Sequence, residues 1–201
     1  MDIDNKAFYD RLREKVGPFH QRQINADGGG MDTMIEAMEY AANGAPQWED
    51  LRWGSYCFAT AWWETGTEMQ PIPERGKGKG HTYGMPAGPY KLIYYGRGLV
   101  QLTWYDNYVA CTAMLQKLGY DLVDLAKDPE QALDPSISAL ILFYGMEQGQ
   151  FSKGNTLAKY FPAGGPSDPV GARRIVNGTD RAAEIADLYH RFAYGFGVEK
   201  P

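Results

Sequence analysis

Apolar residues recur at helical spacing over much of the chain. Residues 5–16 carry a short amphipathic pattern, and residues 31–42 place Met31, Met34, Ile35 and Met38 on one face before Asn43-Gly44, which is an ordinary helix stop. A longer run over residues 47–65 carries a stripe of mostly aromatic residues and ends at Gly66. These patterns predict three helices, and we expect the last of them to be central.

Helix starts are also marked in the second half of the chain. Asp-Pro pairs at 128–129, 134–135 and 168–169 combine an N-cap residue with a proline at the first helical position, where the missing N–H is not needed. Two further apolar patterns predict helices over residues 105–118 and 180–192. The chain is therefore predicted to be mainly α-helical.

Glycines and prolines interrupt every helical pattern in residues 66–103. The alternating pieces 91–96 and 99–104 predict a small hairpin or sheet, with Val100, Leu102 and Trp104 on one face and Gln101 and Thr103 on the other. A glycine-rich stretch of this length is more often functional than accidental. We expect residues 1–201 to form one catalytic domain of two lobes, with residues 66–103 supplying cleft loops and short strands.

Charge and composition narrow the range of ligands. The net charge of −5 gives no global attraction for nucleic acid or an anionic membrane. The 24 glycines and 13% aromatic content fit either an aromatic core or a surface that stacks on flat ligands such as sugars or bases. One local basic concentration predicts either a solvated loop or contact with an acidic or acetylated polymer; its members are Arg75, Lys77, Lys79, His81, Lys91 and Arg97.

The cysteines, the N-terminal residues and the lengths of the apolar runs indicate where the protein is found and whether it enters membranes. Cys57 and Cys111 both lie in apolar helical patterns, which predicts buried, reduced thiols. The N-terminal residues do not have the pattern of a secretory signal, and no run approaches 18 apolar residues, so we expect a protein that is cytoplasmic as synthesised and does not insert into membranes. A monomer is the default expectation.

Several common catalytic motifs are absent from the sequence. Residues 76–81, GKGKGH, fit neither phosphate-binding pattern and follow no apolar strand. The chain has no G-x-S-x-G, and His20, His81 and His190 are too scattered for a triad or a zinc site. We therefore predict no metal and no cofactor.

A pair of glutamates offers a different chemistry. Glu64 ends the aromatic helical run directly after Trp62 and Trp63, and apolar surroundings there would disfavour its ionised form. Glu74 follows a proline-rich break in a polar, basic stretch that favours an ionised carboxylate. Two carboxyl groups in opposite environments are what glycosidic cleavage requires. Glu68, four residues after Glu64, competes with Glu74 for the second role.

Three segments in order resemble the family 19 glycoside hydrolases, which are chitinases and related lysozyme-like enzymes. They are WET at 63–65 followed by MQPIPE at 69–74, YYGRGLVQLTW at 94–104 with Asn107-Tyr108, and ARRIVNG at 172–178. The resemblance covers roughly residues 20–195. It implies a two-lobed, mainly helical fold with a small sheet beside a substrate groove, and the compact form looks most like a phage or prophage endolysin.

The resemblance also implies roles for individual residues. Glu64 aligns with the general acid, Glu74 with the general base, and Thr103 with a residue that holds the attacking water. Gln101, Asn107 and Asn177 match sugar-contacting positions, and Tyr95 and Trp104 match cleft aromatics. Trp63 departs from the pattern, which usually has a histidine before the acid.

We therefore expect an inverting enzyme that cleaves β-1,4 bonds of N-acetylated amino-sugar polymers, most naturally bacterial peptidoglycan. It would reach the cell wall after release, by way of a separate membrane pore. Two alternatives remain open at this stage: a chitinase acting on chitin oligomers, and a noncatalytic protein that binds cell-wall glycan with the same fold.

Overall fold

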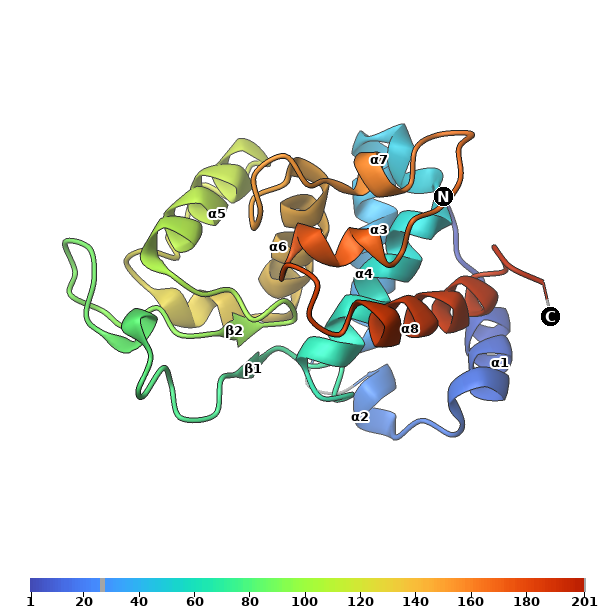
Figure 1. The fold of residues 1–201 in the computed structure, drawn as a ribbon, viewed down its shortest axis with the longest axis horizontal. Coiled ribbons are helices and arrows are strands. Elements are labelled where there is room, and N and C mark those ends of the chain that lie inside the picture. Colours follow the sequence, from blue (N-terminus) through green and yellow to red (C-terminus); the bar gives the residue numbers. More distant parts are fainter. Residues whose placement is uncertain (26–27, 201) are drawn as a thin grey trace.

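A computed structural model describes residues 1–25 and 28–200, and these residues are mainly helical (Figure 1). The α-helices are α1 (Asn5–Val16), α2 (Gln21–Ile24), α3 (Met31–Gly44), α4 (Leu51–Glu64), α5 (Tyr105–Lys117), α6 (Pro135–Gln148), α7 (Leu157–Tyr160) and α8 (Ala182–Gly195). Short 3₁₀ helices are η1 (Pro46–Glu49), η2 (Thr82–Gly84), η3 (Pro129–Leu133) and η4 (Gly171–Ile175). The two strands are β1 (Ile72–Pro73) and β2 (Arg97–Gly98).

The elements group into two lobes that share helix α6. In the larger lobe α8 packs along α4 and α1, and α3 packs on α6. The smaller lobe holds β1, β2, α5 and η3, which lie at the opposite end of the molecule in Figure 1. Helix α6 contacts α3 and α4 of the larger lobe and α5 and η3 of the smaller lobe. The two lobes therefore share one hydrophobic core through α6.

Helix α6 can take this central place because it is apolar around its whole circumference. Ten consecutive residues, 137–146, are buried. A helix that is hydrophobic all round is one that a protein surrounds with other elements. Its start is fixed by Asp134, whose side chain accepts a hydrogen bond from the backbone N–H of Ile137.

The predicted helices over 5–16, 31–42, 105–118 and 180–192 are confirmed, with shifts of a few residues at their ends. Two starts differ from the prediction, and a third, Asp128-Pro129, begins only the 3₁₀ helix η3. The run from residue 47 begins as η1, and α4 starts only at Leu51, because Asp50 accepts a hydrogen bond from the Arg52 N–H and caps the helix there. Asp168-Pro169 does not begin an α-helix: Asp168 accepts from the Gly171 N–H, and η4 follows.

The sheet is smaller than predicted and pairs different residues. β1 and β2 are antiparallel, with Ile72 opposite Gly98 and Pro73 opposite Arg97. Residues 91–96 and 99–104 do not form the two strands of a hairpin. Positive φ angles at Gln101 (52°) and Trp104 (72°) turn the backbone out of the extended conformation, so the predicted alternation of faces over 99–104 is wrong.

Cys57 and Cys111 are buried, as predicted, and both are free. Burial raises the pKa of the Cys111 thiol to about 12 and raises the pKa of Cys57 well above its ordinary value. Within residues 1–25 and 28–200, no helix combines the length and the hydropathy of a membrane span.

Candidate active site

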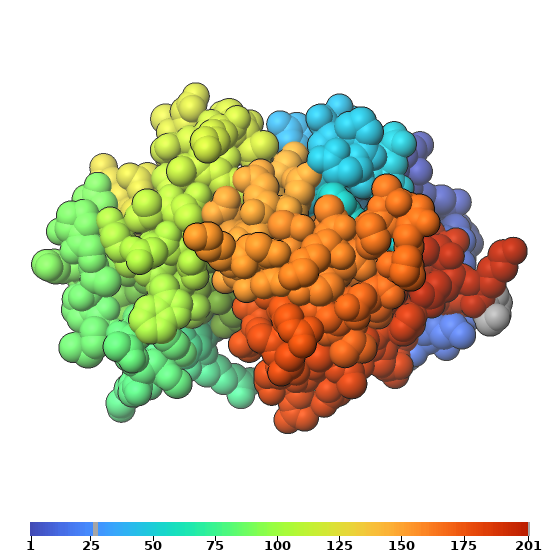
Figure 2. Space-filling model, turned by 45° about the horizontal axis from the view of Figure 1, so that its top comes forward, coloured from blue at the N-terminus to red at the C-terminus, as the bar shows by residue number. Residues whose placement is uncertain are grey.

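Two adjoining cavities lie between the lobes, where Figure 2 shows a hollow between the green segment and the red C-terminal elements. The first, the Thr103 cavity, encloses about 330 Å³. The second, the Glu74 cavity, encloses about 550 Å³. Glu64 and Gln101 line both cavities, so the two form one continuous cleft.

The cleft gathers seven of the eight predicted site residues. The Thr103 cavity is lined by Glu64, Gln101, Thr103, Trp104, Asn107 and Asn177, together with Val100, Leu102, Phe151 and Val176. Glu74 lines the second cavity together with Glu64 at the end of α4, Glu68 and Arg75. The cleft thus brings together residues that are far apart in the sequence. They come from α4, the 72–75 segment, the 100–107 segment and the loop after η4.

Glu64 is the last residue of α4, and its carboxylate is held by an arginine. Oε1 of Glu64 accepts a hydrogen bond from the Arg173 guanidinium at 2.8 Å, and its side chain is only 16% exposed. Apolar side chains line the cavities around Glu64, as predicted, but the sequence did not predict this cation. Successive residues on a helix point about 100° apart, so Trp62 packs against Phe19 and Phe192 while Glu64 faces the cleft.

Arg173 is one of two site residues whose role the sequence did not indicate. It lies in η4, its side chain is 2% exposed, and its Nε donates to the Asp180 carbonyl at 2.9 Å. The segment 172–178 contains two adjacent arginines, and only Arg173 turns inward; Arg174 is exposed. A buried arginine requires a buried acceptor, and the sequence did not indicate that Glu64 would be that acceptor.

Glu74 is held through both of its carboxylate oxygens. Oε1 accepts from the Tyr83 hydroxyl at 2.9 Å, and Oε2 accepts from the backbone N–H of Gly96 at 3.1 Å. The backbone of Glu74 also donates to the Gly96 carbonyl at 2.7 Å. The carboxylate is therefore fixed in one orientation on the edge of the cleft.

Tyr83, a second residue that the sequence did not single out, connects Glu74 to the aromatic wall. Its ring meets that of Trp104 edge to face, with centroids 5.5 Å apart, and stacks on His81 at 4.9 Å. Burial, and then the hydrogen bond to Glu74, raise the pKa of Tyr83. The phenol therefore remains a donor to the carboxylate throughout the neutral range.

Gly96 allows this close approach. A Cβ built on Gly96 would lie 2.8 Å from Oε1 of Gln101 and 3.4 Å from Cβ of Glu74. Gln101 in turn donates from Nε2 to the Ile72 carbonyl at 2.9 Å, which ties the turn after β2 to β1. A side chain at position 96 would separate the segments that hold Glu74.

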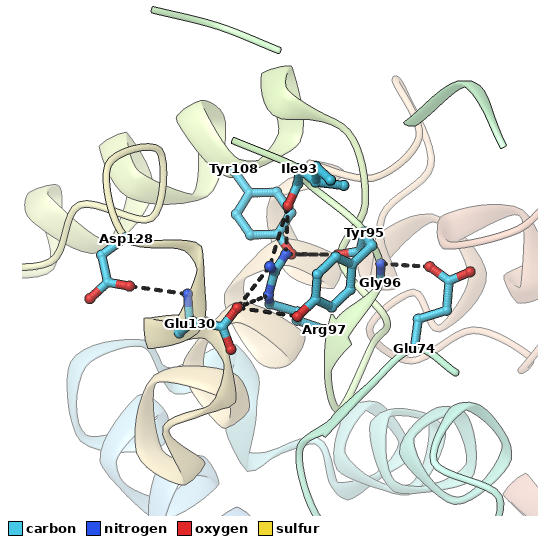
Figure 3. A network of polar contacts seen from close by, with 8 residues as sticks. All are labelled: Glu74, Ile93, Tyr95, Gly96, Arg97, Tyr108, Asp128 and Glu130. Atoms are coloured by element: carbon cyan, nitrogen blue, oxygen red, sulfur yellow. Dashed lines mark hydrogen bonds and ion pairs between the residues drawn. The ribbon is translucent and has the colours of Figure 1, made fainter. Parts of the chain in front are cut away.

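A network centred on the buried Arg97 side chain fixes the backbone next to Gly96 (Figure 3). The Arg97 side chain is 3% exposed, stacks 3.5 Å from the Tyr95 ring centroid, and donates to Oε1 of Glu130 at 2.8 Å. It also donates to the Tyr108 hydroxyl at 3.0 Å, and that hydroxyl donates to the Tyr95 carbonyl at 2.7 Å. Because of this burial Arg97 is not part of the exposed basic concentration, contrary to the prediction.

Tyr95 is the predicted site residue that the structure does not bring to the cleft. It is 6% exposed, and its hydroxyl lies 3.2 Å from Oε1 of Glu130. Its ring packs under the Arg97 guanidinium instead of facing a ligand. Trp104, by contrast, is 48% exposed and lines the Thr103 cavity.

Some polar side chains of the Thr103 cavity form hydrogen bonds within the protein, and others do not. Asn107 donates from Nδ2 to the Thr103 carbonyl at 2.8 Å, which fixes the first turn of α5. Among residues 1–25 and 28–200, no hydrogen bond is formed by the Thr103 hydroxyl or by the side-chain amide of Asn177. These two groups are free to bind a water molecule or a ligand.

Glu68 and Trp63 also line the Glu74 cavity. The Glu68 side chain is 52% exposed, and its nearest cation is Arg22 at 3.9 Å. Glu68 therefore lacks the fixed orientation of Glu74. Trp63, at the usual histidine position of the resembled family, is 36% exposed and also lines an apolar groove between α4 and α8.

No cluster of three or more metal-ligating side chains occurs in the part of the chain that the structure describes. Between a helical lobe and a loop-rich lobe, the cleft presents two carboxyl groups that are held by fixed donors, Glu64 and Glu74, and a third, Glu68, that is mostly exposed. This arrangement defines a class of two-lobed helical proteins with a paired-carboxylate cleft.

The comparison with solved structures agrees with this class. Chitinase C from Streptomyces griseus HUT6037 superimposes with a TM-score of 0.62 at 17% identity, over 94% of this chain and 75% of that one. A bacterial family 19 chitinase gives a TM-score of 0.61 at 21% identity, over 98% and 96% of the two chains. A point mutant of chitinase C gives 0.55 at 16% identity, over 97% and 92%. This chain therefore has the fold of family 19 chitinases, as predicted.

No family model matches the sequence, and no curated protein matches it.

Proposed function

We propose that this protein is an inverting glycoside hydrolase that cleaves β-1,4 bonds of N-acetylated amino-sugar polymers, with bacterial peptidoglycan as its substrate. The observation that carries the proposal is the placement of Glu64 and Glu74 on one cavity, each held by different donors. The shared fold with proteins described as chitinases supports the same reaction class.

In the proposed reaction Glu64 is the general acid and protonates the glycosidic oxygen as the bond to the anomeric carbon breaks. The Arg173 guanidinium occupies Oε1, so the transferred proton is carried by Oε2. After the transfer, the same guanidinium stabilises the carboxylate that forms. A third group that orients the acid is a common feature of acid–base sites.

Glu74 is the general base in this scheme. It accepts a proton from a water molecule, and the oxygen of that water attacks the anomeric carbon on the face opposite the leaving group. Tyr83 and the Gly96 N–H keep the carboxylate directed at one position. The Thr103 hydroxyl supplies a second contact for the water, and Gln101, Trp104, Asn107 and Asn177 contact the sugar.

Glu74 is a better candidate than Glu68 for the base because it is fixed by two hydrogen bonds, whereas Glu68 is mostly exposed. Positioning matters because a small displacement of a catalytic group costs much of its effect. We assign the second carboxylate to Glu74 on this ground.

The test compares wild type and Glu64→Gln on purified peptidoglycan. We expect the variant to keep the far-UV circular dichroism spectrum and to release no reducing ends. Undiminished release would refute the assignment of Glu64. Glu68→Gln, a carboxylate on the same cavity, is the matched control and should retain activity.

Chitin is the second candidate substrate, favoured by the names of the structurally similar proteins. Mass spectrometry of the products from peptidoglycan and chitin oligomers, digested side by side, identifies the substrate and the bond that is cut. A noncatalytic glycan binder would sediment with both polymers and release fragments from neither. A lysis enzyme of the endolysin type, released through a separate pore, is the biological role that fits cleavage of peptidoglycan.

A further inference from the structure

A strip of positive charge borders the cleft and takes no part in the proposed acid–base chemistry. Residues 75–105 contain five Lys or Arg residues and no Asp or Glu, in a chain whose net charge is −5. Arg97 is buried, as described above, which leaves an exposed set that we name the basic strip: Arg75, Lys77, Lys79 and Lys91. Among the described residues, none of the four forms an ion pair.

The strip starts at the cleft itself. Arg75 directly follows Glu74 and lines the same cavity as Glu64 and Glu74. Lys77 lies with its Nζ 5.9 Å from the Tyr95 ring centroid, against the smaller lobe. Arg75 therefore places positive charge in the cavity in which a glycan would be cut, and Lys77 and Lys79 follow it directly along the chain.

The backbone of the strip is a folded series of turns. The N–H groups of Lys77, Lys79 and His81 donate to the carbonyls of the residues three positions earlier, at 3.0–3.2 Å. A Cβ on Gly84 would collide with the Gly78 carbonyl, so the two ends of this series touch. The glycines between the cations thus let the chain turn tightly while Lys77 and Lys79 stay exposed.

Unpaired cations at the rim of a binding cleft attract anions and raise their local concentration. Chitin is a neutral polymer and offers no such group. Peptidoglycan carries carboxylates on the peptides that branch from alternate sugars, close to the glycosidic bonds. Charge complementarity therefore favours a branched, carboxylate-bearing glycan over a neutral one.

We propose that the basic strip is a binding site for the carboxylates of the peptides attached to peptidoglycan, and that it selects this polymer over chitin. This inference rests on the proposed function, because it assumes that a glycan occupies the adjoining cleft. It adds a substrate-selecting surface that is separate from the two catalytic carboxyl groups.

The test measures binding, so that it does not depend on catalysis. In a Glu64→Gln background, the triple variant Arg75→Gln/Lys77→Gln/Lys79→Gln is compared with the control Lys117→Gln/Lys127→Gln/Lys200→Gln. The control removes the same charge from three exposed lysines that line none of the cavities described above. Sedimentation is followed with peptidoglycan stripped of phosphate polymers, with the same material after its carboxylates are coupled to ethanolamine, and with chitin.

At low ionic strength we expect the strip variant to bind stripped peptidoglycan roughly tenfold more weakly than the control, as for a few exposed charge contacts. The difference should vanish in high salt and on the carboxylate-blocked polymer, and chitin binding should not change. An equal loss on chitin, or no loss on peptidoglycan, would overturn the proposal.

Two further outcomes would assign the strip to another ligand. Strip-dependent binding that requires the phosphate polymers would identify phosphate as the anion, and retention of duplex DNA by the wild type with equal affinity would identify a nucleic-acid surface. Either result overturns the proposal. Hydrolysis is measured separately with the unmutated protein, so failure of the proposed function is distinguished from failure of this inference.

Discussion

The guanidinium of Arg173 lies 2.8 Å from the carboxylate of Glu64, a residue 109 positions earlier in the chain. The Arg173 side chain is 2% exposed and that of Glu64 16% exposed, so the pair is largely removed from water. The contact joins the end of α4 to η4 across the floor of the cleft. The position of the proposed acid therefore depends on an element from the last sixth of the chain.

Removal of this arginine is expected to damage stability and activity together. Arg173→Ala should lower the free energy of unfolding by about 3–5 kcal/mol, because it leaves a buried carboxylate without its partner. Urea denaturation measures the change. Glu64→Gln keeps an oxygen acceptor for Arg173 and should be destabilised less, and a larger loss for Glu64→Gln would contradict the ion-pair interpretation.

Loss of the Tyr83 hydroxyl should slow catalysis without weakening substrate binding. A hydrogen bond to a charged group contributes about 1.5–3 kcal/mol, so we expect Tyr83→Phe to lower kcat roughly tenfold or more, with KM within about twofold. Tyr90→Phe, at an exposed tyrosine of the same loop, is the control.

A double-variant comparison separates positioning from a general effect of Tyr83 on the fold. In a Glu74→Ala background Tyr83→Phe should cause no further loss, because the carboxylate on which it acts is gone. Multiplicative losses would show that Tyr83 acts elsewhere.

The two candidates for the second carboxylate should give sharply different variants. Removal of a general base usually costs 10²–10⁴-fold in rate, so Glu74→Gln is expected to fall by about that factor. Glu68→Gln should stay within about twofold of wild type. Initial rates of reducing-end release measure both, and the reverse ranking would transfer the role to Glu68.

In the network next to Gly96, removal of the charge of Arg97 should cost much more stability than removal of the charge of Glu130. Arg97→Ala removes a buried cation that stacks on Tyr95 and bonds Glu130 and Tyr108, and should cost about 3–5 kcal/mol of unfolding free energy. Glu130 is 59% exposed, so Glu130→Gln should cost less than about 1 kcal/mol. Chemical denaturation of both variants, with matching m-values, tests the contrast.

Stability should decline in strong alkali, in part because of Cys111. Burial raises the pKa of this thiol from 9.0 to about 12, so the folded protein holds its proton where the unfolded chain has lost it. Its contribution is thus present below pH 9 and is lost as the pH rises toward 12. Cys111→Ala should show a shallower decline in urea midpoint between pH 9 and 11. An identical slope would contradict the shift.

The sequence predicted most helices because their signals are local. Asp134 with Pro135 marks the start of α6 through a cap that involves only neighbouring residues. The sequence could not predict that Arg173 pairs with Glu64, because Arg173 is distant in the chain and turns inward only when η4 packs. Tyr83 was missed for the same reason: its role depends on a loop that folds back onto Glu74.

Composition and motif could not show which aromatic residues line the cleft. Tyr95 and Trp104 belong to one motif, and both were expected to line the cleft. Trp104 does so at a positive φ that turns it outward, whereas Tyr95 is covered by Arg97. Only the packing of the smaller lobe distinguishes a ring that faces a ligand from one that supports the backbone.

The backbone contact between Glu74 and Gly96 closes residues 75–95 into a loop whose two ends lie together. Lengthening such a loop adds little entropic cost, since the cost grows only with the logarithm of its length. The charge and length of this loop can therefore change on either side of Tyr83, which must stay in place to hold Glu74, while the helix that bears Glu64 is unaffected. Lys77 and Lys79 can thus vary without displacing the residues that hold Glu64 and Glu74.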